Sequence, residues 1–371
     1  MNLSYWEYKS WLSDIDYTVV GSGIVGLNCA LYLKKRFPDS KILILEKGAL
    51  PQGASTKNAG FACFGSISEI LSDLRKTSED EVLALVKRRW EGIRLLRKNL
   101  GDDCIGFQNY GGHEVFLDHQ RQLFDECKGN LKEINELLYS VFHQDAFRLQ
   151  SNSFGFQGIQ EQYISNSLES QIDTGRMMDA LLKKVRQHDI SILNAVLVED
   201  FSDNVDEVAI KTDKFEFKTK KLLFATNGFA SNLLDQKIEP ARAQVLITKP
   251  LVGLRIHGTF HLDEGYYYFR NINNRILLGG GRNLDFEKER TTDFEVTDLV
   301  QNKLETLLST VILPETAFEI DCRWSGIMGV GSIKKPVVEQ LSDNVYCGVR
   351  LGGMGIAIGS SIGKELSDLV T

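Results

Sequence analysis

Short apolar runs alternate with an amphipathic segment over the first fifty residues of the chain. An apolar run at Tyr17–Val20 precedes an amphipathic stretch at Leu27–Leu33, and a second apolar run covers Ile42–Leu45. Apolar runs of this length are typical of buried strands, and apolar positions at helical spacing are typical of a helix packed on one face. This part of the sequence therefore predicts a strand, a helix and a second strand.

Three glycines lie where the first strand meets the helix, and an acid ends the second strand. Gly21, Gly23 and Gly26 occupy the turn, and Glu46 follows twenty positions after the last of them. In dinucleotide-binding units these glycines permit a tight turn, close approach of a pyrophosphate and close packing of helix on strand. The helix N-terminus attracts phosphate, and the acid suits a ribose hydroxyl. The unit predicts a dinucleotide site, because an ordinary strand-to-helix turn does not explain Glu46.

Longer periodic segments predict further helices. Ser78 and Glu81 are spaced as a capping box at the start of one of them, and Gly101 is expected to end it. A short helix packed on the body is expected within Met1–Asp14, in place of a signal peptide. The other predicted helices cover Ser78–Leu100, Arg121–Leu138, Thr174–His188, Asp293–Ser309 and Ile356–Val370.

Short apolar runs separated by turn-forming residues predict strands after residue 189. Four of them predict a meander: Ile190–Leu193, Val196–Phe201, Glu207–Thr212 and Phe215–Phe217. The meander leads into an apolar strand at Lys221–Phe224 that ends in the small residues Ala225–Gly228. Further strands are expected at Gln244–Thr248, Tyr266–Arg270, Arg275–Gly279 and Asn344–Val349.

The elements that suit a dinucleotide are not contiguous, which predicts an interrupted domain. The expected fold class is α/β, with a Rossmann-like domain and a second, mainly antiparallel β-sheet domain that carries helices. The first domain is expected to comprise residues 1–100, 165–235 and 323–371, and the substrate domain residues 101–164 and 236–322. A nicotinamide dehydrogenase usually has one uninterrupted dinucleotide domain, so the interruption favours a flavoprotein.

Composition narrows the possible partners. The chain has 371 residues and a net charge of −7, which argues against a nucleic-acid groove or an anionic membrane surface. No apolar run approaches the ~20 residues of a membrane span. The six cysteines form no Cys-x-x-Cys pair, which indicates reduced thiols and a cytoplasmic location. His257 and His261 have helical spacing in a strand-like context, so no metal site is expected.

Several motifs, taken jointly and in order, resemble the flavin-dependent oxidoreductases of the D-amino-acid oxidase, glycine oxidase and sarcosine oxidase family. The resemblance covers nearly the whole chain. It rests on the glycine turn with Glu46 and on these further motifs: Gly53–Gly60, Ala225–Gly228, Pro240–Gln244, Tyr266–Arg270, Gly279–Arg282, Arg323–Gly326 and Gly352–Gly355.

The resemblance implies FAD bound in an extended form. It implies non-covalent binding, because Ile327–Gly331 contains no cysteine at the place where sarcosine-oxidase-like members attach the flavin. The turn at Gly352–Gly355 would aim a helix N-terminus at the flavin, where its partial positive charge stabilises the negative charge of reduction. The residues matched to FAD are Gly21, Gly23, Ile24, Val25, Gly26, Glu46, Lys47, Ser55, Thr56, Asn58, Ala59, Gly60, Val196, Ala225, Thr226, Gly228, Gly326, Gly353, Met354, Gly355 and Ile356.

The same resemblance indicates where substrate would bind. Tyr266 matches a family tyrosine, and strand alternation places Tyr268 on the same face, although packing of both rings in a core remains an alternative. Met328 stands where the family's amino-acid oxidases have an arginine for the substrate carboxylate. Substitutes for that arginine are Arg270, Arg282 and Arg350, and the expected substrate-site residues are Tyr266, Tyr268, Met328 and Arg282.

The implied activity is oxidation of a C–N bond in an amine or amino acid by hydride transfer to flavin N5. Oxygen or another acceptor would then reoxidise the flavin. Leu277 stands where sarcosine-oxidase-like members have a lysine that speeds the reaction with oxygen, so oxidase and dehydrogenase both remain open. Two other functions also remain open, an FAD-linked 2-hydroxy-acid dehydrogenase and a non-catalytic FAD-binding electron-relay subunit.

Overall fold

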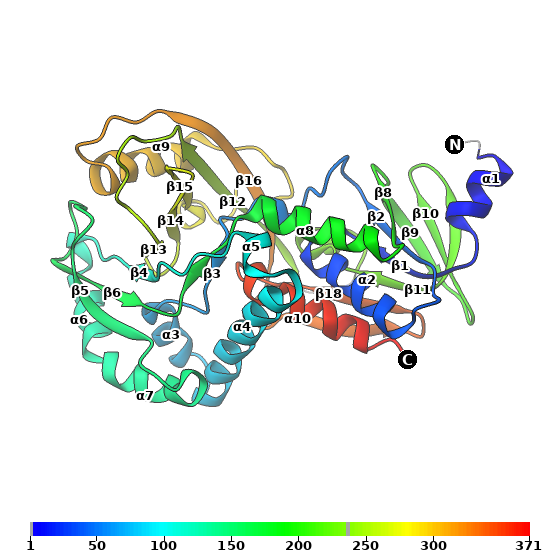
Figure 1. Cartoon of the computed structure of the whole chain (residues 1–371), viewed down its shortest axis with the longest axis horizontal. Coiled ribbons are helices and arrows are strands. Elements are labelled where there is room, and N and C mark those ends of the chain that lie inside the picture. The colour runs from blue at the N-terminus through cyan, green and yellow to red at the C-terminus, as the bar shows by residue number, and fades with distance from the viewer. Residues whose placement is uncertain (1–2, 235–237) are drawn as a thin grey trace.

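The computed structural model describes residues 3–234 and 238–371, and two sheets of eight strands each organise it (Figure 1). One sheet is built on a parallel core and the other is mostly antiparallel, which confirms the expected fold class. The two sheets occupy opposite halves of the molecule in Figure 1, and the helices α4 and α8 lie between them in that view. Residues 1–2 and the expected domain boundary at 235–236 lie outside the described residues.

The first sheet has its parallel strands in the order β18-β11-β1-β2-β8. The strands β17, β10 and β9 extend it by antiparallel pairing. The bounds of its strands are Ile15–Val20 (β1), Ile42–Glu46 (β2), Ser191–Asn194 (β8), Val198–Asp203 (β9), Val208–Thr212 (β10), Glu216–Phe224 (β11), Val337–Ser342 (β17) and Val345–Val349 (β18).

The central strands of this sheet are apolar on both faces because helices and loops cover both sides. Along β1, Val19 enters one hydrophobic core and Val20 enters the other. This is the pattern of parallel strands buried on two sides. The helices α2 (Ile24–Arg36) and α10 (Gly355–Asp368) pack on one face, with α8 (Thr174–Gln187) beside α2.

The second sheet has the order β16-β12-β15-β14-β13-β4-β6-β5, and only its β13–β4 pair is parallel among the pairs described. The bounds of its strands are Gly112–Glu114 (β4), Phe147–Ser151 (β5), Gln162–Asn166 (β6), Glu239–Thr248 (β12), Thr259–Leu262 (β13), Tyr267–Ile272 (β14), Arg275–Gly280 (β15) and Ile320–Val330 (β16). One core places α9 (Asp298–Leu307) against β12, β14 and β15. A separate core joins α3 (Ile67–Leu74), α4 (Glu79–Leu100), α6 (Arg121–Gly129) and α7 (Leu131–Phe142) to the other end of the sheet.

Smaller elements connect the two halves. Strands β3 (Phe61–Ala62) and β7 (Ser170–Gln171) form a two-stranded sheet, and α5 (Asp102–Ile105) directly follows α4. The strand β16 continues the second sheet to Val330, beyond residue 323, where the dinucleotide domain was expected to resume. The division into domains stays a prediction.

The structure corrects several predicted elements. The helix expected over Arg121–Leu138 is two helices, which meet at Asn130, whose side-chain amide donates to the Glu126 carbonyl oxygen. The helix expected from Asp293 begins at Asp298, since the Thr297 N–H donates to the side chain of Gln244 instead. Ser78 caps α4 through the Glu81 N–H, but the return bond of a capping box is missing.

The predicted meander is also only partly right. The strands β9, β10 and β11 form one, but β8 pairs in parallel with β2 and belongs to the central sheet. The runs at Phe215–Phe217 and Lys221–Phe224 form the single strand β11. At the N-terminus, α1 (Tyr5–Glu7) and the π-helical turn Tyr8–Leu12 bury only Leu12, so the expected helix does not pack its aromatic residues on the body.

Candidate functional site

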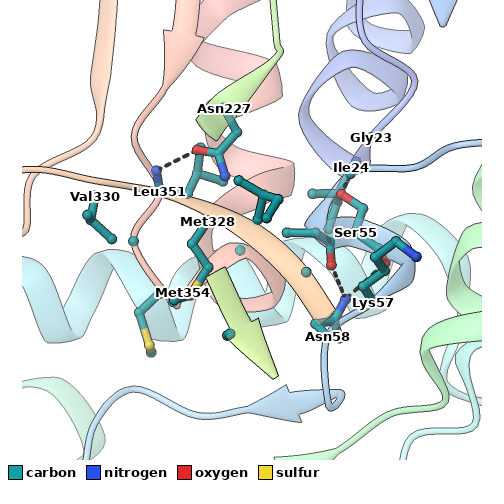
Figure 2. Close-up of a pocket in the computed structure, with 18 of the residues that line it drawn as sticks. Gly23, Ile24, Ser55, Lys57, Asn58, Asn227, Met328, Val330, Leu351 and Met354 are labelled. Atoms are coloured by element: carbon teal, nitrogen blue, oxygen red, sulfur yellow. Dashed lines mark hydrogen bonds between the residues drawn. The ribbon is translucent and has the colours of Figure 1, made fainter. Parts of the chain in front are cut away.

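A cavity of about 850 Å³ lies between the two sheets. Its wall combines the N-terminal ends of α2 and α10, the loop before β3, and residues of β13, β14 and β16. Cavities that bind small molecules usually measure about 300–1,000 Å³, so this one suits a large ligand. Figure 2 shows the central part of the wall, where Met328 and Met354 lie on one side and Gly23 and Ser55 on the other.

The turn before α2 brings bare backbone to the cavity. Gly21 has a φ of +105°, which favours glycine, and a side chain at Gly23 would place its Cβ 2.9 Å from Ser55 Oγ. Ser55 Oγ accepts a hydrogen bond of 2.9 Å from the Ile24 N–H, which fixes the first turn of α2 against the loop (Figure 2). Gly23 has no side chain to cap the helix, so the other N–H groups of its first turn are available to an anion.

Glu46 holds the same turn from the side. Its carboxylate is buried and accepts hydrogen bonds from Ser22 N–H (3.1 Å), Ser22 Oγ (2.7 Å) and Gly48 N–H (3.0 Å). The acid at the end of β2 therefore orders the glycine turn in addition to facing the cavity. Ser22 was not singled out from the sequence, although its place between two motif glycines was visible.

The second helix end at the cavity is that of α10. Gly353, Met354, Gly355 and Ile356 all line the cavity, and no side chain caps the helix. Asn227 holds the preceding segment, since its Oδ1 accepts a hydrogen bond of 3.1 Å from the Leu351 N–H (Figure 2). Asn227 has a φ of +47°, a conformation that asparagine tolerates better than most residues. The sequence motif around Ala225–Gly228 pointed to this segment but not to this role.

The tyrosines at the start of β14 and directly before it lie as strand alternation predicted. Tyr266 and Tyr268 line the cavity, and Tyr267 is buried in the core beneath the sheet. The Tyr268 ring covers Gly279 on the neighbouring strand, where a Cβ would lie 2.8 Å from the tyrosine hydroxyl oxygen. Burial raises the pKa of Tyr268 to about 12, so its hydroxyl keeps its proton near neutral pH.

Of the three candidate arginines, Arg282 alone lines the cavity. Its guanidinium lies 4.9 Å above the Phe286 ring and has no carboxylate within ion-pair distance among the described residues. Burial lowers the pKa of Arg282. Arg270 is buried in the sheet outside the cavity wall, and Arg350 donates to the Lys335 carbonyl oxygen.

Met328 and Leu277, the two positions where this chain departs from the family pattern, lie in different surroundings. Met328 lines the cavity with its side chain directed inward (Figure 2). Leu277 instead packs in a small apolar cluster with Ala59 and Val245. The described wall therefore presents a thioether where a guanidinium was the family pattern.

Most residues matched to a cofactor line the cavity, but three do not. A Cβ on Gly26 would lie 1.9 Å from the Gly21 carbonyl oxygen, so this glycine serves the contact of α2 with the turn. Thr56 Oγ1 donates to the Pro51 carbonyl oxygen, away from the wall. Gly228 lies against the Met328 backbone, where a Cβ would come within 2.5 Å of its oxygen. The assignment of these three to direct cofactor contact is not supported by the cavity wall.

The cavity wall also contains Cys63 and His261, which the sequence did not single out as site residues. His261 Nε2 lies 2.6 Å from a carboxylate oxygen of the buried Glu169. Cys63, Glu169 and His261 have their ligand atoms within 4.8 Å of one another, whereas the sequence suggested no metal site. Glu169 follows β6 and is separated from His261 by 92 positions, so no local pattern indicates the pair.

No helix among the described residues combines the length and the apolar composition that crossing a membrane requires.

Solved structures with the same fold are numerous, and their identities with this chain are low. Iminodiacetate oxidase from Chelativorans sp. BNC1 superposes with a TM-score of 0.76 at 17% identity, covering 95% of each chain. Glycine oxidase from Geobacillus kaustophilus has a TM-score of 0.75 at 18% identity, covering 96% of this chain and 94% of its own. L-proline dehydrogenase from P. horikoshii has a TM-score of 0.74 at 18% identity, covering 96% and 93%. Among curated protein sequences, none matches.

The family follows from the sequence as a whole. The glycine turn before α2, the acid Glu46 and the N-terminal end of α10 all line one cavity, as the resemblance to flavin-dependent oxidoreductases implied. A family model described as FAD dependent oxidoreductase matches residues 16–369, nearly the whole chain. The protein therefore belongs to the FAD dependent oxidoreductase family and is an FAD-dependent enzyme.

Proposed function

We propose that the protein oxidises a C–N bond in an amine or amino acid, with non-covalently bound FAD as the electron acceptor. The observation that carries the proposal is the single cavity that runs from the glycine turn of α2, past the end of α10, to Tyr266 and Tyr268. Three structures with this fold are named for the oxidation or dehydrogenation of iminodiacetate, glycine and L-proline, and each of these compounds contains a C–N bond.

The residues present suit FAD. The glycine turn at the N-terminal end of α2 would hold the pyrophosphate, and Glu46 would face the ribose. Val196 lines the cavity beside Glu46, to whose carbonyl oxygen its N–H donates, and would flank the adenine. The flavin would lie near Asn58, Ala59 and the end of α10. When bound, FAD would supply the acceptor for the hydride on the carbon next to the substrate nitrogen.

The chain's own residues would orient the substrate and stabilise the charge that the reaction develops. As the hydride leaves, the lone pair of a neutral substrate amine forms the C=N bond, and the proton of that nitrogen is lost to solvent before the imine is hydrolysed. No side-chain base is required for this step. The uncapped end of α10 would stabilise negative charge at the flavin. The hydroxyl of Tyr268 is a protonated donor, and Arg282 would contact the substrate.

Anaerobic titration of the FAD-loaded protein tests the proposal. Addition of primary amines, amino acids and 2-hydroxy acids is followed through the visible absorption band of oxidised flavin. Bleaching by an amine or amino acid is the expected result, and substrate-dependent release of ammonia or of a primary amine identifies C–N cleavage.

Three other outcomes contradict the proposal in different ways. Bleaching by 2-hydroxy acids alone would assign a hydroxy-acid dehydrogenase. Bleaching by dithionite but by none of the donors would assign an electron-relay subunit. Purified protein that is colourless and cannot be reconstituted with FAD would overturn the placement of the cofactor itself.

A further inference from the structure

His261 lines the cavity from the second sheet, at the end where the substrate is expected to bind. It belongs to β13 and pairs directly across the strands with Tyr268 of β14, so both side chains share the face that lines the cavity. The Phe61 ring contacts both of them, at centroid distances of 5.3 Å from His261 and 5.6 Å from Tyr268. His261 is only 6% exposed, so it is a buried group at the wall of a ligand cavity.

Glu169 fixes the orientation and the charge of this imidazole. Its Oε1 lies 2.6 Å from His261 Nε2 and also accepts a hydrogen bond of 2.7 Å from Thr259 Oγ1. Burial opposes protonation of His261, but Glu169 outweighs it and, with Glu69 and Glu114, raises the pKa of His261 to about 9. Glu114, opposite His261 on β4, accepts from Ser68, and burial raises its pKa. The imidazole is therefore a cation near neutral pH.

The second ring nitrogen of His261 has no partner. Among the described residues, no hydrogen-bond acceptor lies within reach of Nδ1, whereas Nε2 is taken by Glu169. An imidazolium carries an N–H at each nitrogen, so the Nδ1–H is a second donor. Since the side chain lines the cavity, this donor is placed to bond an acceptor on a bound ligand.

A metal ion held by Cys63, Glu169 and His261 is the competing explanation. Two atoms that both bind one zinc ion at about 2 Å in tetrahedral geometry lie about 3.3 Å apart. His261 Nε2 and Glu169 Oε1 are 2.6 Å apart, which is the spacing of a shared proton. Burial also raises the pKa of the Cys63 thiol well above its ordinary value, which opposes the thiolate that a metal requires. The cluster is an ion pair beside a thiol.

We propose that His261, oriented by Glu169, binds the carboxylate of the substrate through its free ring N–H. The inference rests on the proposed function and narrows the substrate class to amines that bear a carboxylate. It also explains how the chain dispenses with the arginine whose place Met328 occupies. Arg282, half-buried above the Phe286 ring, contacts a more distant part of the same substrate.

Acetate, with acetamide as its uncharged counterpart, probes this site without turnover. Titration of the FAD-loaded protein is followed through the shift that a ligand in the cavity causes in the flavin absorption band. We expect saturable binding of acetate, little binding of acetamide, and acetate affinity about 10- to 100-fold weaker in His261→Asn, because a charge-assisted hydrogen bond is lost. His113→Asn is the matched control, since His113 is a buried histidine of β4 outside the cavity wall.

Glu169→Gln tests the positioning role separately. It leaves the imidazole in place but removes the carboxylate that keeps it charged. Acetate binding should therefore be lost as the pH rises through about 6.5, the ordinary pKa of histidine, or through a lower pH. In the unmodified protein binding should persist towards pH 9. A purely structural role of Glu169 would lower stability without moving this pH dependence.

Several results would overturn the inference while leaving the proposed function intact. Acetate affinity in His261→Asn equal to that of the His113→Asn control is one, and an unchanged pH dependence in Glu169→Gln is another. One equivalent of zinc that co-purifies with the protein and is lost in Cys63→Ala is a third. If no amine reduces the flavin at all, the proposed function fails first, which the anaerobic titration shows independently.

Discussion

Gly23 shows how one residue decides whether backbone can approach a phosphate. Its backbone is extended and would accept any residue, but a Cβ at this position would meet Ser55 Oγ at 2.9 Å. Ser55 cannot withdraw easily, because it holds the Ile24 N–H at the start of α2. The constraint is therefore steric, and it acts on the surface where the pyrophosphate is expected.

Gly23→Val should give a folded protein that purifies without FAD. The two added methyl groups push Ser55 away and occupy the phosphate position at the end of α2. The measurement is the ratio of flavin to protein absorbance after reconstitution with excess FAD. Gly129→Ala, at a site where a Cβ meets nothing within 4 Å, is the control and should retain full occupancy. Full FAD occupancy in Gly23→Val would show that the cofactor lies elsewhere.

Site residues could be predicted from the sequence where they lie close together along the chain. Gly21, Gly23 and Glu46 lie within one strand-helix-strand unit, so spacing alone brought them together. His261 gave no such signal, because its charge depends on Glu169, which lies 92 residues earlier. The two residues meet because β4 pairs with β13 and also with β6, the strand before Glu169. Gly26, Thr56 and Gly228 show a second limit, since they belong to the motifs but lie outside the cavity wall.

Helix α10 carries two tasks at the scale of elements. Its N-terminus lines the cavity, and its next turns pack against α2 through Gly359 and Gly363, which are spaced four residues apart. A Cβ on Gly363 would lie 2.6 Å from the Val25 carbonyl oxygen, and one on Gly359 would lie 2.5 Å from the Ile24 side chain. Because these two glycines present no side chain to α2, the helices α2 and α10 approach closely, and the N-terminal ends of both reach the same cavity.

Gly363→Val should therefore weaken both stability and FAD binding. The contact is with backbone, which cannot move aside as a side chain does, and overpacking of this kind costs about 1–3 kcal/mol or more. Chemical denaturation of the FAD-loaded protein measures the stability, and FAD titration of the apoprotein measures the affinity. Ser361→Ala, two residues earlier on the same helix, is the matched control. Unchanged stability in Gly363→Val would mean that α2 and α10 are further apart than described.

The sequence predicted α10 as a helix but not its distance from α2. Apolar periodicity identifies the buried face of a helix, whereas the partner and the spacing depend on the fold as a whole. The same limit explains β8, whose apolar run is compatible with a meander and with a parallel pair. Only its place beside β2 decides between them.

At the scale of the molecule, two histidines in neighbouring strands have opposite preferences for a proton. His261 is stabilised as a cation by Glu169, with a pKa of about 9, while burial lowers the pKa of His113 to about 4. Both would titrate near 6.5 in the unfolded chain. The second sheet therefore holds one histidine charged and the other neutral across most of the physiological pH range.

The free energy of unfolding should consequently decline on both sides of a pH near 6.5. Above it the unfolded chain releases the proton that His261 retains, so the stabilisation from this pair is lost as the pH rises towards 9. Below it the unfolded chain binds a proton that His113 does not take up, so stability is lost as the pH falls towards 4. Each arm is on the order of 3 kcal/mol, from a shift of roughly 2.5 pH units.

Denaturant titrations of the FAD-loaded protein at pH 4.5, 6.5 and 9 measure both arms. His261→Asn should be less stable than the unmodified protein at pH 6.5, and the difference should shrink at pH 9, where the unmodified protein has lost this contribution. His113→Asn should flatten the acid arm alone, because its partner Ser165 can bond an amide as well as an imidazole. A difference between His261→Asn and the unmodified protein that stays constant from pH 6.5 to 9 would show that His261 is not held as a cation.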